Sequence, residues 1–404
     1  MDKKQKNDKL RQHYVPKFYL RNFSENNKSI GLYRFKEKKI IKQGSIRDIL
    51  QKKYYYGKNP YVENKLANYE GKWSDIISYI IETESLPIDA KNLILLRYFI
   101  LISSARTQKR GDEINKYCTS LMKKLLEIED PEFFESLKIA ENDRFSMRME
   151  FPSLSFIDAA GQILPLVIDL KLELLINKSN IDYVTSDNPT VFYNQLFQFK
   201  NLSRGFGWGE YGIQFIIPIS PKIAICMYDG EVYNLRKRIF NSSKQINKLN
   251  ELFLNNSDEL IVFMYGEDDK VKEEKLSYIN RIVKKRRQVS VKNEDSNLIN
   301  FSNKQVVGKY DLSDIFKIKK KYKDMIISKH NKDEIEKKVN TEVEKLVAKM
   351  QSMPEDELKI LLENKKSELI SIAFNDMERP WVKFYNIHQS KIIDMFMNRA
   401  ENNN

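Results

Sequence analysis

The sequence is poor in cysteine and histidine, with two cysteines and three histidines in 404 residues. Cys118 and Cys226 are too few for a disulfide framework or a cysteine zinc site, which fits a reducing cytosol. The longest apolar run, Leu93 to Ile102, contains Arg97 and is about half of the ~20 residues that span a bilayer. The charged N-terminal residues precede no apolar segment, so we expect no secretion signal, no membrane association and a cytoplasmic protein.

Several catalytic signatures are also absent from the sequence. It contains no His-Glu-x-x-His, Walker, kinase or zinc-ligand pattern. The glycine-rich stretch 205–212 lacks the strand-to-helix context of a phosphate loop, so no nucleotide or flavin cofactor is expected. Because His330 and His388 lie in the charged C-terminal part, His13 is the only histidine available to the core.

Positive charge is in excess. The 69 Lys and Arg residues outnumber the 56 Asp and Glu residues, and the net charge of +13 favours polyanionic partners such as nucleic acid. Basic clusters occur at 284–287 and 317–323 and are candidate phosphate contacts. The alternative is that these runs form solvated helix faces.

The order of sequence patterns predicts an α+β fold. Segments 29–35 and 39–42 indicate a hairpin, and residues of about 60–150 are helical in pattern. Short Ile- and Tyr-rich runs then indicate strands of one sheet. These runs are 172–176, 181–185, 213–217, 223–228 and 260–265. We predict a core domain (1–265), with a helical layer on a mainly antiparallel sheet, and a charged, mainly helical C-terminal extension (266–404), with amphipathic helices at 334–350 and 355–374.

The segment from Gln12 to Phe23 contains His13 and packs aromatic residues around a proline. Pro16 suits the first turn of a helix, and Val15 before it favours an extended backbone. His13 is therefore expected in an extended lead to a short helix. A histidine held there can act as a general base, a metal ligand or a phosphate contact. The alternative is a ring that hydrogen-bonds a backbone carbonyl.

Glu63 and Glu70 are seven residues apart in the helix expected after Pro60. This spacing places them within about 20° of each other on one helix face. The same face carries Leu66 and Trp73, and charge on an apolar stripe is costly unless it is paired, protonated or bound to metal. The alternative is that each glutamate forms a salt bridge to a neighbouring element.

Two further residues complete the candidate site. Arg106 follows the small residues 103–105 and is a candidate for binding phosphate or stabilising developing charge. Asp187 ends an expected strand in a turn sequence, where a rigid sheet can position a catalytic carboxylate. The alternative for Asp187 is a turn that only stops the strand.

Several of these motifs, taken together, resemble the family called domain of unknown function 4238, a mainly bacterial family without an assigned activity. The resemblance covers about residues 11–265. Its motifs are His13-Tyr14-Val15-Pro16, Phe18 to Phe23, Glu63, Glu70, Arg106, Thr185-Ser186-Asp187-Asn188-Pro189 and Pro218-Ile219-Ser220-Pro221. The resemblance implies no mechanism.

The residues fit two classes of protein. The first is a metal-dependent hydrolase of nucleic acid phosphodiesters, a nuclease or phosphodiesterase, in which Glu63, Glu70 and Asp187 hold Mg²⁺ or Mn²⁺. His13 then acts as a base or phosphate contact and Arg106 stabilises charge. The second is a non-catalytic nucleic-acid-binding or regulatory protein that uses the aromatic stretch 205–212 and the basic clusters. A role in defence against phage would fit either class, and a small-molecule hydrolase is a third option.

Overall fold

A computed structural model describes residues 10–136, 146–196, 208–266, 268–286 and 310–322, together with Arg379 and Val382. Its helices are α2 (Lys17–Arg21), α3 (Tyr61–Thr83), α4 (Ala90–Ala105), α5 (Gln108–Glu129), α6 (Pro131–Ser136), α7 (Pro152–Ile163), α8 (Ser243–Asn256) and α9 (Asp269–Ile282), with 3-10 turns η1 (Leu164–Val167) and η3 (Val283–Lys285). Helices and mostly antiparallel sheets make the protein mixed α+β, as predicted.

The main sheet has five strands in the order β11-β5-β9-β8-β7. All neighbours are antiparallel except β11 and β5, which run parallel. The strands are β5 (Lys171–Asn177), β7 (Val191–Asn194), β8 (Ile213–Pro218), β9 (Ile223–Tyr228) and β11 (Ile239–Phe240). Every residue of β8 and β9 is buried, which is expected only where both faces of a sheet are covered.

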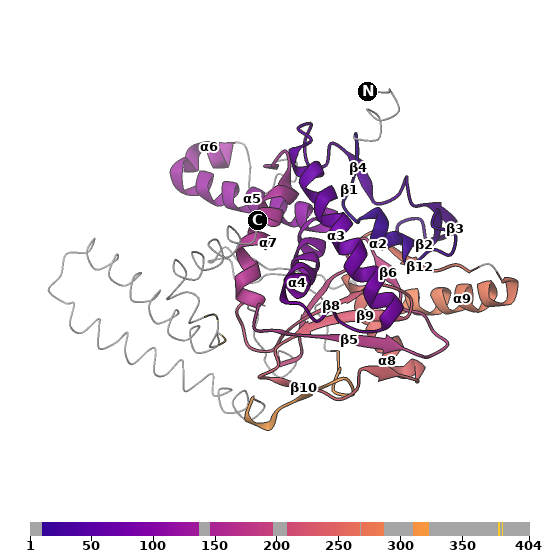
Figure 1. Ribbon diagram of the computed structural model, residues 1–404. Coiled ribbons are helices and arrows are strands. Elements are labelled where there is room, and N and C mark those ends of the chain that lie inside the picture. The colour runs from indigo at the N-terminus through magenta and orange to yellow at the C-terminus, as the bar shows by residue number, and fades with distance from the viewer. Residues whose placement is uncertain are drawn as a thin grey trace.

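Alternate residues of the main sheet enter two different cores. Phe215 and Ile225 pack into the core that contains Trp73 of α3, whereas Ile216 and Cys226 pack with α8 residues in the second core. The strand repeat of two residues explains the alternation. Figure 1 shows α3 and α4 on one side of β5, β8 and β9, and α8 on the other. The predicted helical layer on a mainly antiparallel sheet is therefore confirmed, with a second layer beneath it.

The prediction of one sheet was wrong. A second sheet has the order β3-β2-β12-β6 and consists of β2 (Ser29–Arg34), β3 (Lys39–Ser45), β6 (Thr185–Ser186) and β12 (Leu260–Phe263). The hairpin of β2 and β3 is as expected. The run 181–185 forms a strand only at its end, because Tyr183 donates its N–H to Pro221 O and Val184 donates to Asn250 Oδ1. The Asn250 side chain thus takes the place of a backbone acceptor on a neighbouring strand.

Two short strand pairs complete the fold. The strand β1 (Arg11–His13) pairs with β4 (Gln51–Lys53), and β10 (Tyr233–Leu235) pairs with β13 (Phe316–Ile318). None of the described helices combines the length and the apolar character needed to cross a membrane.

The described part of the C-terminal extension packs against the core. Ile315 and Phe316 are fully buried in the same core as α8, and the Arg379 guanidinium donates to Asp169 Oδ1 at 2.7 Å. Phe316 belongs to strand β13, which was not predicted from the sequence. The predicted helices at 334–350 and 355–374 lie outside the described residues, and the division at 265/266 stays a prediction.

Candidate functional site around Glu63 and Arg106

His13 ends β1, just before the short helix α2. Pro16 is the N-cap residue of α2, with the extended backbone that precedes a helix, so the predicted local structure is confirmed. The imidazole is buried, and its Nε2 donates to Ile46 O at 3.2 Å. Burial, followed by the positive charge of Lys17, lowers the pKa of His13 to about 4. His13 is therefore neutral at pH 7. Its ring hydrogen-bonds a backbone carbonyl, which was the alternative to a functional role.

Arg106 joins the N-terminal motif to helix α3. It follows the last residue of α4, its side chain is 2% exposed, and its guanidinium makes three hydrogen bonds. These bonds run from Nε to the Tyr56 hydroxyl at 2.9 Å, and from the two terminal nitrogens to Glu70 Oε1 at 2.7 Å and His13 O at 2.5 Å. Tyr56 also donates to His13 O at 3.2 Å. This network fixes the position of the motif on the helical layer.

Glu63 and Glu70 differ in their partners although they share one face of α3. Glu70 forms the salt bridge to Arg106 that the sequence offered as an alternative. Glu63 Oε2 is buried and accepts no hydrogen bond from the described residues. Burial raises the pKa of Glu63, and Glu70 adds to this, whereas Arg106 and Lys17 oppose it. Within this group of described residues, Glu63 is thus the carboxylate with a buried oxygen that accepts no hydrogen bond.

Asp187 follows β6, and both of its oxygens bind the chain that enters β12. Its Oδ1 accepts the Asp258 N–H at 2.9 Å, and its Oδ2 accepts those of Glu259 at 2.5 Å and Leu260 at 3.2 Å. Burial raises the pKa of Asp187 to about 6, although these N–H groups favour the ionised form. Asp187 is thus a structural acceptor for a neighbouring strand, and not the local turn that the sequence offered as an alternative.

Asn188 reinforces this connection. Its Nδ2 donates to Asn256 O at 3.0 Å, and Asn256 Nδ2 returns a bond to Asn188 O at 2.6 Å. The same Asn256 amide also donates to Thr190 O at 3.0 Å. The Ser-Asp-Asn-Pro motif therefore fastens the end of α8 and the start of β12 to the segment between β6 and β7.

The predicted site residues fall into two groups. His13, Glu63, Glu70 and Arg106 interact with one another electrostatically or through hydrogen bonds. Asp187 instead raises the pKa of the Tyr14 phenol, after the larger effect of burial. In the part of the chain that the structure describes, no three Asp, Glu, His or Cys side chains are grouped as metal ligands. Binding of Mg²⁺ or Mn²⁺ by Glu63, Glu70 and Asp187 stays a prediction.

Three residues of these groups were not predicted from the sequence. Lys17 influences both His13 and Glu63, Tyr56 bridges Arg106 and His13, and Lys109 donates to Asn256 O at 3.1 Å. Burial lowers the pKa of Lys109. The run of three tyrosines at 54–56 was the only signal for Tyr56, and nothing in the spacing indicated Lys109.

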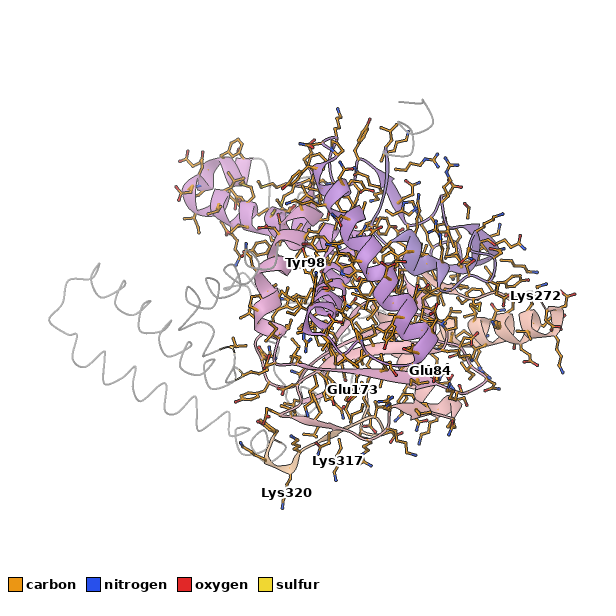
Figure 2. All side chains as sticks on the ribbon, viewed as in Figure 1. Glu84, Tyr98, Glu173, Lys272, Lys317 and Lys320 are labelled. Atoms are coloured by element: carbon orange, nitrogen blue, oxygen red, sulfur yellow. The ribbon has the colours of Figure 1, made fainter. Side chains whose placement is uncertain are left out.

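The two basic clusters differ in the contacts that their side chains make. In the cluster 284–287, Lys285 pairs with Glu251, and Arg286 donates to Ser257 O and Asp258 O while lying 3.7 Å from the centre of the Phe35 ring. In the cluster 317–323, Lys317 and Lys320 are exposed, and Figure 2 shows them extending from the lower edge of the protein. Arg287 and Lys323 lie outside the described residues.

The aromatic stretch 205–212 is described only from Trp208 onward. The Trp208 ring stacks on Phe192 at 5.1 Å and on Phe215 at 5.4 Å between ring centres. Trp208 therefore contributes to packing against the main sheet.

The fold and the motif network define an α+β protein organised by a buried Arg106 and its partners. The chain matches the family model described as "Protein of unknown function (DUF4238)" over residues 11–267, which is more than half of its length. It therefore belongs to this family. No curated protein and no solved structure matches the chain.

Proposed function

We propose that the protein is a hydrolase of nucleic acid phosphodiesters and that Glu63 is its reactive carboxylate. The observation that carries the proposal is the buried Oε2 of Glu63, which accepts no hydrogen bond from the described residues. An unsatisfied buried acceptor is costly, and carboxyl groups whose pKa is raised by burial, as that of Glu63 is, occur often at functional sites. A ligand cation or an attacking water would satisfy this oxygen.

The neighbouring residues have distinct roles in this proposal. Lys17 is partly exposed and supplies positive charge for a substrate phosphate. Arg106 keeps Glu70 and the His13 backbone in place, because all three of its nitrogens are already engaged. His13 is a positioning residue, since a pKa of about 4 makes it a weak base at pH 7. Asp187 supports the β12 side of the fold.

Glu63 can act in two ways. As a general base, it accepts a proton from water while the water oxygen bonds to phosphorus. The bond from phosphorus to the leaving oxygen then breaks, and that oxygen takes up a proton. Alternatively, Glu63 and Glu70 hold Mg²⁺ or Mn²⁺, which prefer carboxylate oxygens. The first version retains activity in EDTA, and the second requires the cation.

The test is cleavage of single-stranded DNA, double-stranded DNA and RNA by the full chain, with Mg²⁺, Mn²⁺ or EDTA. Because a general base contributes about 10²–10⁴-fold, Glu63→Gln is expected to lower the cleavage rate at least ~100-fold. Asp75→Asn, an exposed change on the same helix, is the matched control and leaves the rate unchanged. A folded wild-type protein that cleaves none of these substrates contradicts the proposal, as does full activity of Glu63→Gln.

Nucleic acid binding without catalysis is the second candidate. It is favoured by the exposed Lys317, Lys320 and Lys321 around β13 and by the net charge of +13. Fluorescence anisotropy with the same nucleic acids measures it directly. Replacing these three lysines by glutamine is expected to weaken binding and to flatten its salt dependence. Unchanged binding and salt dependence in the triple variant would exclude this surface.

A further inference from the structure

A pocket of ≈ 330 Å³ lies between α8 and the end of α9. It shares no residue with the site around Glu63 and Arg106. Ser243 and Asn247 line it from α8, where a spacing of four residues places them on one helix face. Tyr278, Arg281 and Lys285 line it from the other side, at similar spacings along α9 and η3. Figure 1 shows α8 and α9 in the right half of the view, and residues of both helices belong to the second core.

The pocket has an unneutralised positive charge. Lys285 pairs with Glu251, which is the next residue on the Ser243 and Asn247 face of α8. Arg281 is exposed and forms no salt bridge with the described residues. Its guanidinium lies 5.5 Å from the centre of the Tyr278 ring, an arrangement typical of a cation–π contact. The pocket thus offers Arg281 to an anion.

Hydrogen-bonding groups lie beside this charge. Ser243 and Asn247, which are both partly exposed, line the pocket and carry a hydroxyl and an amide. The neighbouring Ser242 caps α8 by accepting the Lys244 N–H at 3.2 Å. Ser243 is the first residue of α8, and the N-terminal turn of a helix carries a partial positive charge.

The remaining wall is aromatic and apolar. Tyr278 is held by Asn250, whose Nδ2 donates to the tyrosine hydroxyl at 2.9 Å and to Asp182 O at 2.8 Å. The Asn250 Oδ1 accepts the Val184 N–H, so the whole group is anchored to the segment before β6. Ile181 and Ile282 line the pocket beside the Tyr278 ring. A rigid ring flanked by aliphatic groups suits a flat heteroaromatic ligand.

We propose that this pocket binds a nucleoside monophosphate. The phosphate of this ligand contacts Arg281 and the Ser243 hydroxyl, and Lys285 interacts with both the phosphate and Glu251. The base of the ligand lies against Tyr278 and the two isoleucines. The volume is near the lower end of the roughly 300–1,000 Å³ of small-molecule sites, which favours a mononucleotide over a dinucleotide. Neither a Rossmann nor a Walker loop is involved, and the proposal does not depend on the hydrolase assignment.

The test is isothermal titration of the full chain with AMP, adenosine and inorganic phosphate. AMP is expected to bind more tightly than either fragment, because only AMP carries both the phosphate and the base. Arg281→Gln is expected to weaken AMP binding at least tenfold, and Ser243→Ala severalfold. Lys270→Gln removes the same charge from an exposed position of α9 and is the matched control, with unchanged binding.

Three results would overturn the proposal. The first is folded wild-type protein that binds no AMP at millimolar concentration. The second is phosphate binding as tightly as AMP, which would mean that the base is not recognised. The third is equal loss of AMP binding in Arg281→Gln and Lys270→Gln, which would show only a general charge effect. Cleavage assays on the same variants separate this proposal from the proposed hydrolase function. A variant that loses AMP binding but cleaves nucleic acid normally is altered in the pocket alone.

Discussion

Asp187 and Glu63 are two carboxylates whose pKa values are raised first of all by burial, yet their surroundings are opposite. Three backbone N–H groups engage both oxygens of Asp187, whereas Oε2 of Glu63 accepts no hydrogen bond from the described residues. The contrast shows that burial alone does not decide how a carboxylate is used, because Asp187 supports the fold through its donors, whereas Glu63 keeps a buried oxygen without a donor among the described residues, on which its proposed role rests. Both lie within residues 11–267, which match the family model, so membership of the family alone does not make this distinction.

The largest effect is expected for Asp187→Ala. The change leaves the N–H groups of residues 258–260 without their side-chain acceptor, and an unsatisfied buried donor costs about 1–3 kcal/mol, although only the Leu260 bond is fully buried and the other two are part-buried. The free energy of unfolding should fall by about 3 kcal/mol, as measured by urea denaturation. Asp75→Ala, at an exposed position, should change it by less than about 0.5 kcal/mol. Equal stability of the two variants would remove the structural role of Asp187.

The next effect is on the dependence of stability on pH. Folding raises the pKa of Asp187 from 3.8 to about 6, so its contribution to stability is lost as the pH rises through this window. Folding lowers the pKa of His13 from 6.5 to about 4, so its contribution is lost as the pH falls through that window. In the wild-type protein the two changes largely offset each other between pH 4 and 6.5.

Asp187→Asn should uncouple these two contributions. With only His13 titrating, the free energy of unfolding should gain about 3 kcal/mol between pH 4 and 6.5, relative to the wild-type curve. His13→Asn should give a slope of opposite sign. Urea denaturation at pH 4, 5, 6 and 7 measures both. Parallel curves for all three proteins would show that neither pKa is shifted by folding.

The smallest effect compares the two glutamates of α3. Glu70→Gln removes the charge that pairs with Arg106, which is 2% exposed, and should cost about 2 kcal/mol of stability. Glu63→Gln removes no hydrogen bond seen in the described residues and relieves the burial of a charge, so stability should change by less than about 1 kcal/mol. Thermal denaturation compares them. A larger loss for Glu63→Gln would mean that Glu63 has a structural partner.

Local structure could be predicted where one pattern was decisive. The run Leu93–Ile102, which is apolar nearly all round apart from Arg97, lies within helix α4, and the hairpin of β2 and β3 follows the expected segments. The segment 181–185 was predicted less well, because Asn250, 66 residues beyond Val184, supplies its backbone hydrogen bond. Such a partner leaves no trace in periodicity.

The site could be predicted only in part for the same reason. Helical spacing alone placed Glu63 and Glu70 on one face, and the Glu70–Arg106 salt bridge was foreseen as an alternative. The three backbone donors to Asp187 come from 71–73 residues further along the chain. A carboxylate in a turn sequence therefore has the same local pattern whether it binds a strand or a substrate, and only the fold distinguishes these cases.

The contacts of Arg379 bear on the stage of synthesis at which the core can be completed. Its guanidinium bonds to Asp169 and to the Leu166 and Trp208 carbonyls, so the core receives a buried charge from a residue 210 positions after Asp169. A ribosome must have translated residue 379 before this contact can form. A protein expressed only to the family boundary at 267 would keep Asp169 but lack its cation. The segment that matches the family model is therefore shorter than the part of the chain that completes this core.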